Sequence, residues 1–127
     1  MLNIYLAVAA GGAIGSLARY VFVVQAIRLL GAGFPWGTLG VNVIGSLAMG
    51  LASGMFSARA SLPLEMHLFL SVGVLGGFTT FSAFSLDVMT LYERGQFALA
   101  VVYSAASFGL SLGALLLGLT FMRRLLA

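Results

Sequence analysis

The chain has 127 residues, of which 61% are hydrophobic and only 7% are charged. Soluble domains carry about a quarter charged residues, so this composition is that of an integral membrane protein with almost nothing left for a soluble domain. There is no cysteine, which excludes disulfides, thiolate metal sites and thiol catalysis. The six basic residues are all arginines and the formal net charge is +3. Because the arginines are scattered along the chain, we interpret them as loop charges that set membrane topology and not as a nucleic-acid surface.

The first predicted span covers residues 2–30. Small residues recur four apart in it, as at Gly11 and Gly15, and this spacing is typical of close helix contacts in membranes. Arg19 lies near the end of the apolar run. Its side chain either reaches for the membrane interface or supplies a positive charge at the mouth of an anion pathway.

A turn over residues 31–35, rich in Gly and Pro, precedes a second predicted span over 36–57. Thr38, Asn42 and Ser46 follow one another at helical spacing and form a polar stripe on an otherwise apolar helix. The amide of Asn42 is costly in hydrocarbon unless it has a partner. It either bonds to a neighbouring helix or faces a polar pathway as a donor.

The third predicted span, residues 62–92, contains Gly-Gly-Phe-Thr-Thr at 76–80, and glycine and threonine are poor helix formers. We therefore predict that this helix breaks near its middle. A break frees carbonyls on one half-helix and amides on the next, and interrupted membrane helices point to ion sites. Phe78, Phe81 and Phe84 are spaced by three, which predicts that they share one face of the second half.

The fourth predicted span covers residues 96–122. Tyr103, Ser107 and Ser111 lie in strict helical register on it and form a second polar stripe. The only histidine, His67, is given a structural or interfacial role, since one histidine can build neither a histidine metal site nor a triad within one chain. Asp87 is expected close enough to the membrane boundary to be solvated.

Four spans place both termini and the second loop on one side of the membrane. Three arginines fall on that side and two or three on the other, so arginine bias gives almost no preferred orientation. A chain that inserts either way can form an antiparallel dimer with itself. Small-residue faces such as Gly109 with Gly113 also require partners, and we predict a homodimer.

These residues together resemble the Fluc-type fluoride channels, the CrcB family. The matching pieces are Gly15-Ser16-Leu17-Ala18-Arg19-Tyr20 in the first span, Pro35 to Asn42 with Gly45-Ser46 in the second, and Gly76 to Ser82 with Phe84 in the third. With the hydroxyls of the fourth span, the resemblance covers essentially the whole chain.

The resemblance implies an all-α membrane protein, a single four-helix domain over residues 1–127, that acts as a fluoride-selective passive channel. It implies an antiparallel, dual-topology homodimer in a prokaryotic inner membrane, with two fluoride-exporting pores that are each lined by both subunits. The fluoride pathway would be formed by Asn42, Phe81, Phe84, Tyr103, Ser107, Ser111 and Thr38, with Arg19 in a vestibule. The backbone carbonyls of Gly76 and Thr79 would hold a central structural sodium ion. The other expected partners are fluoride and membrane lipid.

Three other classes of protein compete with this interpretation. A small dual-topology multidrug-type transporter needs a carboxylate deep in the membrane, and no acid lies at the centre of any span. An intramembrane enzyme using Ser82 and His67 would need groups about 22 Å apart on one helix to meet. In a structural membrane subunit, Asn42 would only form a hydrogen bond between helices, and no helix break would be needed.

Overall fold

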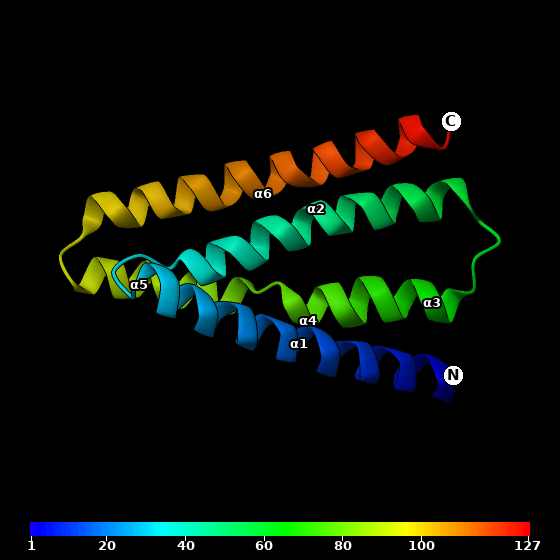
Figure 1. Ribbon diagram of the computed structural model, residues 1–127, viewed down its shortest axis with the longest axis horizontal. Coiled ribbons are helices and arrows are strands. Elements are labelled where there is room, and N and C mark those ends of the chain that lie inside the picture. Colours follow the sequence, from blue (N-terminus) through cyan, green and yellow to red (C-terminus); the bar gives the residue numbers. More distant parts are fainter.

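The structure is a computed structural model that describes residues 1–127, and it contains only helices (Figure 1). Four helical stretches are long and apolar enough to cross a membrane: α1 (Leu2–Leu30), α2 (Trp36–Ala58), the composite third span (Leu64–Glu93) and α6 (Phe97–Leu125). The third span consists of α3 (Leu64–Leu68), η1 (Phe69–Leu75), α4 (Gly76–Phe78) and α5 (Phe81–Glu93). The predicted all-α fold with four spans, the third broken near its middle, is confirmed.

The four spans run side by side as an elongated bundle (Figure 1). Both chain termini and the loop between α2 and α3 lie at one end, and the loops that follow α1 and α5 lie at the other. α1 packs mainly on the first half of the third span, while α2 packs mainly on α6. Since α2 and α6 are the second and fourth spans, they run parallel to each other.

Small residues let these helix pairs approach to backbone contact. A Cβ atom at Gly15 would overlap the carbonyl of Val74, and one at Gly50 would overlap the carbonyl of Leu115. The close contact predicted for Gly11 and Gly15 is therefore present. Gly109 and its partner one turn on have nothing within 4 Å, so the contact predicted for that pair is not made inside the subunit.

The third span departs from a regular α-helix twice. Phe69–Leu75 is a π-helix, a feature that the sequence analysis did not anticipate. The chain then becomes extended at Thr79 and Thr80, with φ/ψ of −85°/158° and −154°/124°. The break thus falls at the two threonines, whereas Gly76 keeps helical angles.

The expected alignment of three phenylalanines on one half-helix is wrong, because the break separates them. Phe78 ends α4 and packs edge-on against Phe22 of α1, with ring centroids 6.3 Å apart. Phe81 and Phe84 lie on α5 and contact each other.

The buried core of the subunit is small and lies toward the α1–α2 loop. It is a cluster of Leu39, Phe84, Leu91, Ala100 and Tyr103. Most large apolar side chains on the outer faces of the spans are exposed. Such a surface is stable only against lipid or another protein chain, so the fold is that of a multi-pass integral membrane protein.

Candidate functional site

The break in the third span is bonded to a single side chain of α2. The backbone amide of Thr80 donates to Asn42 Oδ1 at 2.8 Å, and Asn42 Nδ2 donates to the carbonyl oxygen of Thr80 at 2.9 Å. These two bonds pair the backbone groups that the interrupted helix leaves without partners. They also orient the amide, and they leave the second N–H of Nδ2 available to a ligand.

The bonding around the break also releases two backbone carbonyls. In an unbroken helix the amide of Thr80 would bond to the carbonyl of Gly76, and the amide of Ala83 would bond to the carbonyl of Thr79. The first amide bonds to Asn42 instead, and the second bonds to the hydroxyl of Thr80 at 3.1 Å, which caps α5. The carbonyls of Gly76 and Thr79 therefore lack their helical partners.

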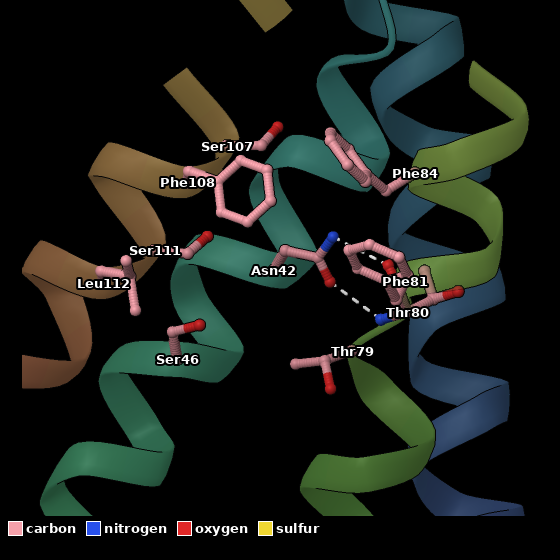
Figure 2. A pocket seen from close by; sticks show the side chains of 10 residues that line it. All are labelled: Asn42, Ser46, Thr79, Thr80, Phe81, Phe84, Ser107, Phe108, Ser111 and Leu112. Atoms are coloured by element: carbon pink, nitrogen blue, oxygen red, sulfur yellow. Dashed lines mark hydrogen bonds between the residues drawn. The ribbon is translucent and has the colours of Figure 1, made fainter. Parts of the chain in front are cut away.

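A cleft of about 250 Å³ opens beside the break, between α2, α5 and α6 (Figure 2). Its walls combine an amide, five hydroxyl side chains and four apolar ones, without any charged group. The lining residues are Asn42, Ser46, Thr79, Thr80, Phe81, Phe84, Ser107, Phe108, Ser111 and Leu112. The structure thus brings together five of the seven residues predicted for the pathway.

Two hydroxyls in this cleft are buried without hydrogen-bond partners. They are Ser107 Oγ and Ser111 Oγ, one turn apart on α6. Serine in an apolar helix normally satisfies its hydroxyl by donating to the carbonyl four residues earlier. Ser104, on the same helix, does so at 2.8 Å. The buried, unpartnered donors of Ser107 and Ser111 are consequently available to an acceptor in the cleft.

Aromatic rings form the other wall. The rings of Phe81 and Phe84 lie 5.5 Å apart on α5, and Phe84 also meets Phe108 of α6 edge-on at 5.9 Å. The hydrogen-bearing rim of an aromatic ring carries the positive end of its quadrupole. Phe81 is 69% exposed, whereas Phe84 is 8% exposed.

The remaining predicted pathway residues lie toward the α1–α2 loop, next to a second cleft of about 150 Å³ that contains Thr38, Asp87 and Arg94. Tyr103 is fully buried, and its hydroxyl donates to Asp87 Oδ2 at 3.0 Å. Thr38 and Ser107 lie close to the same hydroxyl. Asp87, which was expected near the membrane boundary, is half-buried, and the sequence analysis missed its bond to this core tyrosine.

Arg19 lies outside the cleft, whereas Thr80 and Phe108 line it. Arg19 is half-buried on α1 and lines neither of the two clefts, so its vestibule role stays a prediction. Thr80 was missed, although a hydroxyl residue at the start of an apolar half-helix is a capping signal. Phe108 was also missed, and its place in the cleft depends on how α6 is set against α5, for which the sequence carries no local sign.

Fold and site together define a four-span integral membrane protein with an uncharged polar cleft beside a broken helix. A family model described as CrcB-like protein, Camphor Resistance (CrcB), matches residues 6–119. The chain belongs to this CrcB family.

Curated bacterial relatives are similar over almost their entire length. A protein of Nitrobacter hamburgensis named fluoride-specific ion channel FluC 1 is 53% identical over 93% of this chain and 94% of its own. One from Agrobacterium fabrum, named fluoride-specific ion channel FluC, is 51% identical over 98% and 99% of the two chains. One of the same name from Rhodospirillum centenum is 50% identical over 99% and 100%. These relatives are named as ion channels, and the prediction that the chain is not an enzyme is confirmed.

Proposed function

We propose that this protein is a passive channel that exports fluoride across a bacterial inner membrane. The observation that carries the proposal is the pair of buried, unpartnered hydroxyls of Ser107 and Ser111, which share a cleft with the Asn42 amide. Unsatisfied donors inside a membrane protein are costly unless an acceptor visits them. The relatives named fluoride-specific ion channels support fluoride as that acceptor.

Uncharged hydrogen-bond donors suit the conduction of a small anion, because they bind it without holding it in place. Moving a small bare anion from water into a low-dielectric interior costs tens of kcal/mol. A hydrogen bond in an apolar medium is worth about 4–6 kcal/mol, so one amide and two or three hydroxyls supply roughly 20 kcal/mol. The ring edges of Phe81 and Phe84 add weaker attraction. No arginine lines this cleft, and a full positive charge there would trap the anion.

The working unit in this proposal is an antiparallel homodimer with two pores, each lined by residues of both subunits. The cleft is open on one side of the subunit, and Phe81 at its edge is largely exposed. Gly109 and Gly113 form an unfilled small-residue face on α6. A second copy would cover these surfaces, and the near balance of arginines between the two ends permits opposite orientations.

We further propose that the carbonyls of Gly76 and Thr79 from both subunits hold a central sodium ion. Carbonyl oxygens without hydrogen-bond partners suit a hard cation, and the bonding around the break leaves these two without their helical donors. Gly76 is exposed on the subunit surface, as a shared site requires. When bound, the ion would add a fixed positive charge that favours anions nearby.

A flux measurement on reconstituted protein tests the channel. Liposomes loaded with fluoride or chloride are given a potassium ionophore, and anion release is followed with ion-selective electrodes. Rapid fluoride release with chloride retained is expected, and a chain that releases neither ion, or both equally, contradicts the proposal. Blue-native electrophoresis tests the dimer, since only monomers in mild detergent would exclude it.

Replacing sodium with a large organic cation on both sides of the membrane tests the metal site separately. Fluoride flux and dimer stability are both expected to fall. If neither changes, the sodium site is wrong while the fluoride pathway stands.

A further inference from the structure

The side chain of Ser46 is half-buried and lines the same cleft as Asn42 (Figure 2). Like Ser107 and Ser111, it makes no hydrogen bond to the carbonyl one turn earlier. That default bond is present at Ser71, Ser85 and Ser104 elsewhere in the chain. The other helical serines without a bond, Ser16, Ser53 and Ser57, are exposed away from the cleft.

The packing of α2 on α6 sets where Ser46 lies along the cleft. Gly50 of α2 meets the backbone of Leu115 on α6, and one turn further Gly54 meets that of Leu119. Because the two helices run parallel, stepping back one turn at a time on both keeps the pairs in register. The successive levels are then Ser46 with Ser111, Asn42 with Ser107, and Thr38 with Tyr103. The side chains of Thr38 and Tyr103 lie close together, as this register requires.

This register makes the polar lining a ladder of three levels about 6 Å apart, the rise of four helical residues. The level of Thr38 and Tyr103 and the level of Asn42 and Ser107 each have a donor on both helices. At the remaining level, α6 offers Ser111, and the facing donor on α2 is Ser46. Figure 2 shows the Ser46 oxygen directed to the same side of α2 as the Asn42 amide. A Cβ atom at the neighbouring Gly45 would overlap the Thr79 side chain, so this level of the ladder lies directly against the helix break.

We infer that Ser46 is a further anion-contacting residue: its hydroxyl donates to fluoride at the level of Ser111 as the ion passes the helix break. This inference rests on the proposed channel and adds a residue to its pathway. A small anion crossing this level with Ser111 alone would keep one side-chain donor. A second donor from the opposite wall lowers the cost of that level without adding charge.

Three substitutions separate this role from simple packing. Ser46→Ala removes the hydroxyl, Ser46→Cys keeps the side-chain shape with a slightly larger atom that is only a weak donor, and Ser46→Thr keeps the hydroxyl while adding a methyl group. If Ser46 binds the ion, the alanine and cysteine variants conduct fluoride about tenfold more slowly, the effect of losing one hydrogen bond to an ion. The threonine variant conducts close to the unaltered protein. A packing role predicts the reverse order, because threonine is the variant that crowds Gly45 and Thr79.

The assay is fluoride release from liposomes, with elution volume and thermal unfolding measured on each variant. Ser53→Ala, an exposed serine on the same helix, is the matched control and is expected to leave flux unchanged. Alanine and cysteine variants that conduct at the unaltered rate would overturn the inference, as would a threonine variant slower than both. Absence of fluoride flux in the unaltered protein would instead refute the proposed function.

Discussion

Replacing Asn42 with alanine tests the bonding that closes the helix break. The substitution removes two hydrogen bonds to the backbone of Thr80, of 2.9 and 2.8 Å. Side-chain bonds between membrane helices are worth about 0.6 kcal/mol on average and up to about 1.7 kcal/mol each. The pair therefore contributes about 1–3 kcal/mol to folding. The upper part of this range applies here, because both orphaned groups belong to a residue that is 9% exposed.

The free energy of unfolding is measured by titrating folded protein in mixed micelles with a denaturing detergent. Trp36, the only tryptophan, reports the transition by its fluorescence. Asn3→Ala is the matched control, since Asn3 is the only other asparagine and is exposed near the start of α1. If Asn42→Ala destabilises the protein no more than Asn3→Ala does, the bonds to Thr80 do not hold the break, and the account of the site built on them is wrong.

The same variant distinguishes the two roles that the sequence left open for Asn42. In the structure the amide does bond to a neighbouring span, and it keeps one N–H free. We expect Asn42→Ala to abolish fluoride flux even in preparations that remain dimeric. A dimeric variant with undiminished flux would show that the amide acts only as a structural contact.

The other predictions concern the walls around the cleft. Phe81→Ile is expected to abolish fluoride flux and to leave the packing inside the subunit unchanged, since that ring is 69% exposed on the subunit. Phe84→Ile, at a ring that is 8% exposed, is expected to abolish flux and also to lower the free energy of unfolding by about 1 kcal/mol. Gly50→Ala is expected to destabilise the fold by about 1–3 kcal/mol in the detergent titration, because a Cβ there overlaps a backbone carbonyl of α6. Tyr103→Phe is expected to lower the free energy of unfolding by about 1 kcal/mol, because it removes the bond to Asp87. If the two side chains act as one pair, the double variant with Asp87→Ala is destabilised little more than either single variant.

The spans were predictable because apolar length and turn residues are local signals. The α1 helix ends at Leu30 and the α2 helix begins at Trp36, on either side of the Gly- and Pro-containing turn that the sequence indicated. The polar stripes were predictable for the same reason, since helical spacing alone places Asn42, Ser107 and Ser111 on definite faces. Helical spacing does not show which faces of two helices meet. The contact of Phe108 with Phe84 depends only on how α6 packs against α5.

The break was predicted for a partly wrong reason. Propensity treats Gly76 and Gly77 as the weakest points of the helix, yet both remain helical. Gly77 is needed because α1 passes so close that a Cβ would lie 2.8 Å from the carbonyl oxygen of Gly12. A glycine run in a membrane helix therefore marks close packing as readily as it marks a break. The pairing of Asp87 with Tyr103 escaped notice for a similar reason, since 16 residues of separation do not show that two helices face each other.

The position of the break depends on Asn42, which lies 38 positions away from Thr80 in the sequence. Because residues 76 to 80 are poor helix formers, interrupting the helix anywhere among them has a low free-energy cost. An extended residue inside a membrane protein, however, needs partners for its amide and carbonyl. Asn42 offers one acceptor and one donor at the level of Thr80, which fixes the extended segment there. Diverting the amide of Thr80 to Asn42 frees the carbonyl of Gly76, and the adjacent cap on α5 frees that of Thr79. One asparagine on α2 thus determines where the helix opens, leaves the carbonyl of Gly76 without its helical donor, and places an amide N–H at the cleft.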